Sequence, residues 1–243
     1  MAPLPRHVAI IPDGNCRWAR SKGRIVTGGY QAGYRALEAV ITRAQDLGIG
    51  YATVYIASAE NLAKRSDEWR MDFYAFAGRV LHNSLSNVIL EKVKVRLVGD
   101  LSTLPNTLQR DLEDLVQRTQ NNTGLVLSLA IGYSGRKEIL NAVGGLIRTR
   151  KAQSQTQGES ALDAPVSEEE FEKYLGFAGI PSPDLLIRTS GEIRLSGFLL
   201  WHLAYTEMAF IDELWPDFTV ERFEEILADF QQRKRSFGAE SHA

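Results

Sequence analysis

Short runs of apolar, mostly β-branched residues recur along the chain. Each run is almost continuously hydrophobic, which is typical of strands that are buried on both faces of a parallel sheet. Five runs show this pattern: 7–11 (HVAII), 51–57 (YATVYIA), 93–99 (VKVRLVG), 125–132 (LVLSLAIG) and 184–189 (DLLIRT). The pattern therefore predicts five parallel strands.

Longer amphipathic segments lie between these runs. In 29–48 the apolar residues recur at helical spacing on one face, and Gly48 is suited to end the helix. Segments 67–91 and 104–120 repeat this spacing. Because strands and helices alternate, the sequence predicts an α/β fold, with a mostly parallel central sheet flanked by helices.

One stretch, 148–170, is hydrophilic over almost its whole length. We expect a loop or partly mobile linker there, ending at Ser167 as the cap of a further helix. The stretch connects elements of one domain, which we expect to span 1–243.

Composition limits the classes of function. Lysine and arginine total 28 against 30 aspartates and glutamates, and the formal charge of -2 gives no support to general nucleic-acid binding. The single cysteine, Cys16, excludes a disulfide within the chain and a cysteine-cluster zinc site, and suits a reducing compartment. The chain has neither a signal-peptide pattern nor an apolar stretch of about 18 residues. We therefore expect a cytoplasmic protein without a transmembrane segment.

Polar motifs follow four of the predicted strands, at 13–18, 58–65, 132–136 and 188–196. In an open parallel sheet, ligands bind outside the carboxyl ends of the strands. We therefore expect the four loops to converge on one rim of the sheet.

The first of these loops has the chemistry of an anion or metal site. Asp13 supplies a carboxylate that can hold Mg²⁺, Gly14 relaxes the backbone, and Asn15 and Arg17 can donate to phosphate oxygens. A simpler alternative is that Asp13 only caps the next helix. Cys16 could be read as a nucleophile, but a cysteine without a recognisable base partner is more typical of a packing residue.

The last loop is rich in groups that bind diphosphates. Arg188 and Arg194 provide two guanidinium forks and Ser196 a hydroxyl, which suits bidentate recognition of a diphosphate. The alternative is a surface turn with two solvated arginines. Glu207, flanked by apolar residues, would be costly to bury without a cation or a hydrogen-bond donor, so it is a second candidate metal ligand. Two anion sites with a carboxylate near each suit a reaction between two diphosphates.

Six blocks follow one another over almost the whole chain: HVAIIPDGNCRWAR, GYQAGYRAL, YIASAENLAKRSDEW, VRLVGD, LAIGYSGRKEI and DLLIRTSGEIRLSGFLLWHLAYTEMAFIDELWPDF. Together they resemble the cis-prenyltransferase family, of the undecaprenyl diphosphate synthase type. The resemblance implies a parallel α/β fold with a hydrophobic tunnel and a homodimer. It also implies Mg²⁺-dependent condensation of isopentenyl diphosphate with an allylic diphosphate.

The resemblance further implies roles for individual residues. Asp13 would organise Mg²⁺ and the allylic diphosphate, which would also contact Gly14, Asn15, Arg17 and Trp18.

The other implied roles fall on the later loops. Ser58 and Asn61 would lie near the reacting centre, where they would handle a proton and position the substrate. Glu207 would help to bind Mg²⁺, in its own subunit or across the dimer interface. The second diphosphate would be held by Arg188, Arg194 and Ser196.

The allylic site departs from the family pattern. Glycine is usual where Cys16 stands, and an arginine and a histidine that assist the allylic diphosphate are usual at Val26 and Tyr30. Each charge-assisted bond is worth roughly 1.5–3 kcal/mol, so their loss should weaken this site or change what binds there.

The second strand and its loop depart as well. Leu62 replaces a tryptophan, and the arginine that follows is either replaced by Lys64 or displaced to Arg65. Ile56 stands where a small residue is common in long-chain enzymes, and Ala57 where an aromatic residue is common. Because close-packed tunnel walls do not move aside to admit a longer hydrocarbon chain, Ile56 in the tunnel should limit the product to roughly two to four isoprene units. The alternative is that Ile56 and Ala57 merely exchange volumes in the core.

Three hypotheses follow for function. The first is a synthase of short Z-configured prenyl diphosphates. The second is an irregular synthase of lavandulyl type, which couples two allylic diphosphates head to middle. The third is a non-catalytic accessory subunit that binds prenyl diphosphates or a partner synthase, against which the retained polar residues argue.

Overall fold

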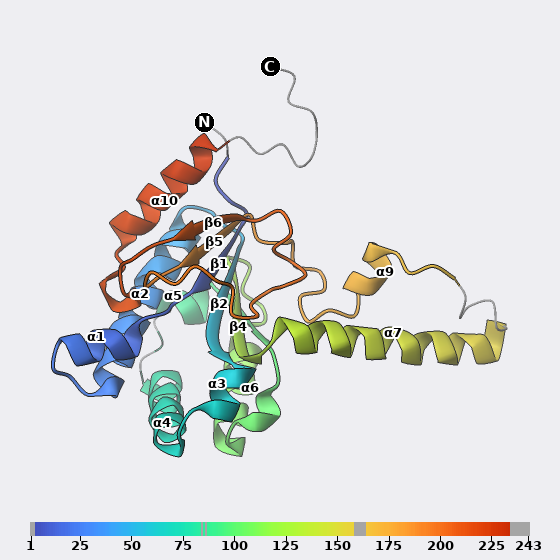
Figure 1. The fold of residues 1–243 in the computed structure, drawn as a ribbon, viewed down its shortest axis with the longest axis horizontal. Helices are drawn as coiled ribbons and strands as arrows, with labels where there is room; N and C mark the ends of the chain where they lie inside the picture. Colours follow the sequence, from blue (N-terminus) through green and yellow to red (C-terminus); the bar gives the residue numbers. More distant parts are fainter. Residues whose placement is uncertain (1–2, 84, 86, 158–163, 234–243) are drawn as a thin grey trace.

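The computed structural model describes residues 3–83, 85, 87–157 and 164–233. Its centre is a six-stranded parallel sheet in the order β3-β4-β2-β1-β5-β6 (Figure 1). The strands are β1 (His7–Ile11), β2 (Tyr51–Ser58), β3 (Lys94–Val98), β4 (Val126–Tyr133), β5 (Leu185–Arg188) and β6 (Glu207–Phe210). The five predicted strands and the α/β fold are confirmed. The edge strand β6 was not predicted, because its four residues, EMAF, are too few to form a recognisable apolar run.

Helices flank this sheet and connect its strands. They are α1 (Asn15–Ser21), α2 (Val26–Asp46), α3 (Ala59–Lys64), α4 (Asp67–Asn83), α5 (Asn87–Glu91), α6 (Asn106–Thr119), α7 (Gly135–Gln157), α9 (Glu168–Glu172) and α10 (Val220–Gln232), with 3-10 turns η1 (Leu101–Thr103) and η2 (Trp215–Asp217). Figure 1 shows that α7 projects away from the sheet, whereas α3, α4 and α6 lie below the sheet in this view and α1 lies to its left.

Two of the predicted segment boundaries are wrong. The segment 67–91 forms two helices, α4 and α5, in place of one. The stretch 148–170, predicted as a loop, is largely helical because α7 continues to Gln157, and 158–163 lie outside the described residues. Its Arg, Lys, Ala and Gln residues are good helix formers, so polarity alone did not indicate a loop.

The predicted helix cap at Ser167 is confirmed. Its hydroxyl accepts the backbone N–H of Glu170 at 3.2 Å, at the start of α9. Glu170 in turn accepts a bond of 2.7 Å from Arg150, so α9 is held against α7.

The hydrophobic core occupies both faces of the sheet. Alternate residues of β1 point to opposite faces, as strand geometry requires. Val8 and Ile10 pack in one cluster with residues of α2 and α10, whereas Ala9 and Ile11 pack in another with Phe198. The central strand β1 is therefore fixed from both sides, and so is the loop that follows it.

His7 fastens the start of β1 to its neighbours. Its Nδ1 lies 2.6 Å from the carbonyl oxygen of Pro181, which can only accept, so Nδ1 carries the proton and Nε2 accepts from the Thr53 hydroxyl at 2.8 Å. Burial lowers the pKa of His7 from 6.5 to about 4.

We expect this histidine to make stability depend on pH. Between pH 6.5 and 4 the unfolded chain binds a proton at His7 that the folded chain does not, so stability is full above pH 6.5 and falls on acidification. The fall should amount to about 3 kcal/mol at most. Urea unfolding at several pH values should show a shallower fall for His7→Gln than for the natural protein, and parallel profiles would contradict this assignment.

Candidate functional site

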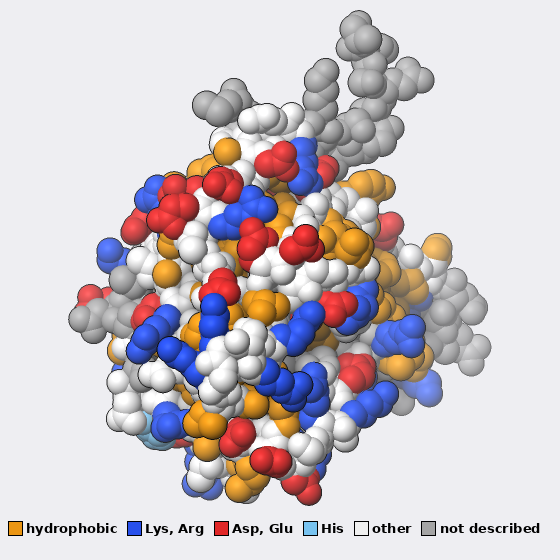
Figure 2. Space-filling model, turned by 60° about the vertical axis from the view of Figure 1, so that its left-hand side comes forward, with side chains coloured by type: hydrophobic (Ala, Val, Ile, Leu, Met, Phe, Trp, Pro, Cys, Tyr) orange, Lys and Arg blue, Asp and Glu red, His pale blue; other side chains and the backbone are white. Residues whose placement is uncertain are grey.

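A cavity of about 520 Å³ opens at the carboxyl ends of the strands and continues between the sheet and the helices α2, α4 and α6. Its mouth is polar, with side chains from the loops after β1, β2 and β5. Its interior is apolar and extends as far as Val95, Leu115 and Leu127. On the neighbouring surface, basic side chains surround patches of apolar ones (Figure 2). The cavity can therefore hold a molecule with a charged head and a hydrocarbon tail.

The turn after β1 is built around Gly14. Its φ of 112° is one that residues with a side chain rarely adopt, and a Cβ there would lie 2.9 Å from Leu214. Asn15, at the start of α1, packs closely against Gly29 and Gly33 of α2. These contacts fix the turn that carries Asp13.

Asp13 is held in an ion-pair network at the mouth. Its Oδ2 accepts a bond of 3.0 Å from Arg188, and its Oδ1 lies 3.7 Å from Arg17. The Thr189 hydroxyl donates to its backbone carbonyl at 2.7 Å. The site is thus a carboxylate between two guanidinium groups, and its charge is balanced by the chain's own cations.

Arg188 is the most deeply buried cation of the site, at 3% exposure. It ends β5 and donates to the Ser196 hydroxyl at 3.0 Å and to the Arg194 carbonyl oxygen. Its Nε is buried and has no hydrogen-bond partner within the described part of the chain. A buried N–H without an acceptor is costly, so this guanidinium can still gain from a bound oxyanion.

Glu192 is a further charged residue of the site that sequence reasoning missed. It pairs with Arg194 and lies 3.5 Å from Arg17, which also donates to the Ser190 carbonyl oxygen at 3.2 Å. The only signal in the sequence was its place inside the motif RTSGEIRLS. Its carboxylate lies beside one terminal nitrogen of each of two guanidinium groups, so an incoming diphosphate must compete with this carboxylate for the two arginines.

Ser58 and Asn61 both line the mouth. The Ser58 hydroxyl accepts the backbone N–H of Asn61 at 2.9 Å and caps α3, which holds the two residues in fixed relation. Asn15 lines the mouth beside them and donates to the Pro12 carbonyl oxygen at 3.3 Å.

Two of the residues that depart from the family pattern in the allylic site, Cys16 and Tyr30, lie at this cavity, whereas Val26 is outside its described lining. Cys16 and Tyr30 line the cavity with Sγ 3.9 Å from the phenol oxygen, and burial raises the pKa of Tyr30 well above its usual value. Arg65 lines the cavity with its guanidinium 5.6 Å from the Trp69 ring, whereas among the described lining residues Lys64 does not appear. Of the two basic residues, Arg65 is therefore the one that reaches the cavity.

Ile56 and Ala57 both line the tunnel, although neighbours on a regular strand point to opposite faces. The pairing of β2 with β4 shifts register at these two residues, so a bulge turns both toward the same side. Ile56 lies in the upper wall and does not form the floor, because the cavity continues past it to Leu127.

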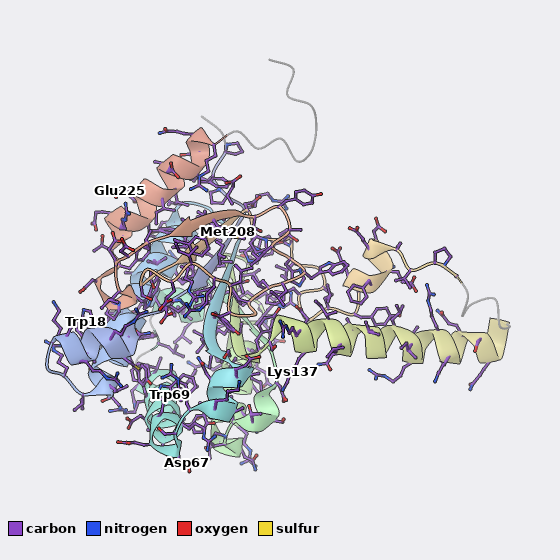
Figure 3. The ribbon with its side chains drawn as sticks, viewed as in Figure 1. Trp18, Asp67, Trp69, Lys137, Met208 and Glu225 are labelled. Atoms are coloured by element: carbon purple, nitrogen blue, oxygen red, sulfur yellow. The ribbon has the colours of Figure 1, made fainter. Side chains whose placement is uncertain are left out.

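Other predicted residues are not brought to the cavity. Trp18 is buried and donates to Asp217 at 2.7 Å, so it fixes α1 to η2 and is absent from the described cavity lining. Figure 3 shows it on α1, whereas Trp69, which does line the cavity, lies on α4. Trp18 therefore lies outside the described lining of this cavity, and its contact with substrate stays a prediction.

The loop at 132–136 also lies outside the described lining. Gly135 donates from its backbone to the Gly197 carbonyl oxygen at 2.8 Å. This loop therefore supports the last loop and adds no group to the rim.

Glu207 lies at the opposite end of the parallel strands from Asp13. It begins β6 opposite Leu185, the first residue of β5, whereas Asp13 follows the strand ends. Its carboxylate accepts a bond of 3.0 Å from Arg233. Within one chain Glu207 and Asp13 therefore lie apart, and the role of Glu207 as a metal ligand stays a prediction.

The carboxylate of Asp13 suits a magnesium ion that is held partly by substrate. Mg²⁺ is commonly bound by one or two carboxylates together with substrate phosphates. Asp13 lies at the mouth and keeps lone pairs that its arginine partners do not use. Within the described residues, no three or more His, Cys, Asp or Glu side chains lie close enough together to hold an ion alone. The residues thus fit an ion shared between Asp13 and a diphosphate.

None of the helices in the described ranges is both long and apolar enough to cross a bilayer.

Comparisons with known proteins agree with this geometry. Residues 11–238 match the family model described as "Putative undecaprenyl diphosphate synthase". The chain is 40% identical to ditrans,polycis-undecaprenyl-diphosphate synthase ((2E,6E)-farnesyl-diphosphate specific) of Micrococcus luteus, over 98% of this chain and 92% of that protein. It is 42% identical to dehydrodolichyl diphosphate synthase 2 of Arabidopsis thaliana, over 97% of this chain and 74% of that protein.

A solved structure is similar over the whole fold. The crystal structure of lavandulyl diphosphate synthase from Lavandula x intermedia, in complex with dimethylallyl diphosphate, matches with a TM-score of 0.87 and 34% identity. The match covers 97% of this chain and 98% of that one.

Proposed function

Because the chain belongs to the undecaprenyl diphosphate synthase family of prenyltransferases, we propose that it adds isopentenyl diphosphate to a short allylic diphosphate and releases a short Z-configured prenyl diphosphate. The observation that carries this proposal is the cavity, whose polar mouth leads directly into an apolar tunnel. The allylic diphosphate would bind at Asp13 and Arg17, with its hydrocarbon in the tunnel. Isopentenyl diphosphate would bind at Arg188, Arg194 and Ser196.

The charges of the mouth suit the bond that must break. Cleavage of the allylic C–O bond leaves negative charge on the departing diphosphate, and guanidinium groups already in place stabilise that charge as it develops. When bound at Asp13, Mg²⁺ would supply Lewis-acid stabilisation of the same group. The alkene of isopentenyl diphosphate then attacks the electron-poor carbon and a proton is lost. Ser58 and Asn61 are placed at the mouth to orient the alkene and assist that proton.

The length of the tunnel supports a short product. Its lining runs along β4 from Ile131 to Leu127, about 13 Å, and along α6 from Leu108 to Leu115, about 10 Å. The three backbone bonds of a residue extend by about 3.5 Å, so the four chain bonds of an isoprene unit extend by roughly 4.5 Å. The tunnel therefore holds about two to three units.

Changes at the bulge should alter product length. Ile56→Ala removes three carbons from the upper wall, so the growing chain should pass more easily, and we expect a larger share of the longest products that the tunnel can hold. Ala57→Leu should have the opposite effect. Chromatography of the alcohols released by phosphatase measures both, with Met71→Ala, on the exposed face of α4, as the control. An unchanged product distribution in both tunnel variants would show that the bulge does not set the length.

A second candidate is irregular coupling of two allylic diphosphates. It is favoured by the uncharged pair Cys16 and Tyr30 beside the Asp13 turn, and by the likeness to the lavandulyl diphosphate synthase that was solved with dimethylallyl diphosphate. Incubation with dimethylallyl diphosphate and Mg²⁺ alone separates the two. Branched products would establish irregular coupling, whereas a requirement for isopentenyl diphosphate would exclude it.

An exposed apolar stripe supports assembly as a homodimer. Leu140 is 69% exposed, and Val143 and Ile147 follow it on the projecting helix α7. Contiguous exposed apolar surface of this kind is typical of protein interfaces. We therefore propose that α7 packs against a second copy of the chain, which sedimentation analysis of the natural protein and of Leu140→Glu would test.

A further inference from the structure

Tyr30 lies where the polar mouth of the cavity meets its apolar tunnel. Its hydroxyl is 3.9 Å from Sγ of Cys16, three residues after Asp13 in the turn proposed to hold the allylic diphosphate. Its ring is close to those of Phe73 and Phe76 on α4, which also line the cavity. In an allylic diphosphate, the bond that breaks joins the charged head to the hydrocarbon. That bond would therefore lie beside Tyr30.

Tyr30 begins a continuous aromatic wall. Its ring centroid is 5.7 Å from that of Phe76 and 6.5 Å from that of Phe73, which it meets edge-on at 81°. Trp69 stacks on Phe73, with centroids 5.5 Å apart and planes 8° from parallel. Rings packed in this way hold one another in place, so the wall is rigid at the point where it reaches the mouth.

The electrical character of this wall differs from that of the rest of the mouth. Arg17 and Arg188 present positive charge to a leaving diphosphate, whereas the ring of Tyr30 presents an electron-rich face without a formal charge. Burial raises the pKa of Tyr30, so the phenol stays neutral at physiological pH. A cation over such a ring, away from water, is stabilised electrostatically.

We infer that Tyr30 is a catalytic residue whose ring, supported by Phe73 and Phe76, stabilises positive charge on the allylic carbon as the C–O bond breaks. The electron pair of that bond leaves with the diphosphate oxygen. The alkene of the second substrate supplies the pair for the new C–C bond, and a proton is lost to restore a double bond. The inference rests on the proposed prenyl transfer, and it assigns a task that the arginines cannot perform.

The test compares Tyr30→Phe with Tyr30→Leu. Phenylalanine keeps the ring, so its kcat should stay within about threefold of the natural value, whereas leucine should lower kcat roughly 10- to 30-fold. Binding of an unreactive thiolo analogue of dimethylallyl diphosphate should change little in either variant, because that molecule carries no positive charge on carbon. With a 2-fluoro allylic substrate, which develops positive charge less readily, the kcat of Tyr30→Leu should fall still further below that of the natural protein.

The controls separate this inference from the proposed function. Tyr74→Leu removes an aromatic ring one residue from Phe73, but Tyr74 is outside the described cavity lining, and the kcat of this variant should be unchanged. Circular dichroism and thermal unfolding show that each variant is folded. Natural protein without turnover on any pair of prenyl diphosphates would refute the proposed function. If the natural protein is active, either of two results would overturn the role of the ring and leave the proposed function standing. One is a Tyr30→Leu variant with the natural kcat, and the other is a Tyr30→Phe variant whose kcat falls as far as that of Tyr30→Leu.

Discussion

Asp13→Asn is expected to lower kcat by about 10³-fold while the protein stays folded. Asparagine keeps an oxygen that can accept from Arg188, so the contact of 3.0 Å survives. It removes the negative charge that would share Mg²⁺ with the allylic diphosphate. The loss should appear mainly in kcat, because the charge matters most when the diphosphate departs.

Steady-state release of diphosphate measures this effect, with thermal unfolding as the check on folding. Asp46→Asn is the matched control, because Asp46 ends α2 and is outside the described lining of the cavity. Raising the Mg²⁺ concentration should restore part of the activity of Asp13→Asn and have no effect on the control. Activity of Asp13→Asn within about tenfold of the natural protein would contradict the role of Asp13.

Arg188→Met should cause the second-largest loss, a fall of at least about 100-fold in kcat/KM. This guanidinium is almost fully buried, pairs with Asp13 and Ser196, and keeps an Nε without a partner in the described structure. Its removal would take away the charge-assisted bonding that we propose it offers to the second diphosphate. It also leaves Asp13 without its principal counterion, so a fall in unfolding temperature should accompany the kinetic loss.

The conservative variant Arg188→Lys distinguishes geometry from charge. Lysine keeps the charge but lacks the planar fork, so activity should lie between those of Arg188→Met and the natural protein. Arg118→Met, which removes an exposed cation on α6 paired with Asp114, is the control and should leave kcat/KM unchanged. Equal kcat/KM for isopentenyl diphosphate in the natural and Arg188→Met proteins would refute the proposed second diphosphate site.

The part of the fold that the sequence predicted is the part governed by burial. Strands such as β1 and β4 are almost continuously apolar because both of their faces are covered, and this pattern is visible without a structure. The helical end of α7 was missed because Arg148 to Gln157 lack an apolar face, and only their intrinsic propensity indicates a helix. The edge strand β6 is too short to give a pattern.

The candidate site was predicted where its residues adjoin a strand end. Asp13, Ser58 and Arg188 each follow or end a buried strand, and parallel topology alone brings such residues to one rim. Trp18 and Glu207 lie outside the described lining of the cavity, and the sequence could not indicate this because sequence position says nothing of side-chain direction or of the strand end at which a residue lies.

Other features of the site depend on tertiary packing. Tyr30 reaches the mouth because Gly29 and Gly33 let α2 approach Asn15 closely, and no local pattern indicates that contact. The shared direction of Ile56 and Ala57 depends on a bulge that strand periodicity cannot reveal.

Product analysis with geranyl diphosphate, labelled isopentenyl diphosphate and Mg²⁺ tests the central claim most directly. A tunnel that holds about two to three isoprene units predicts a linear Z product formed by one addition to the two-unit primer. One diphosphate should be released for each isopentenyl unit incorporated. Products of many more units, or branched products that form without isopentenyl diphosphate, would contradict the account.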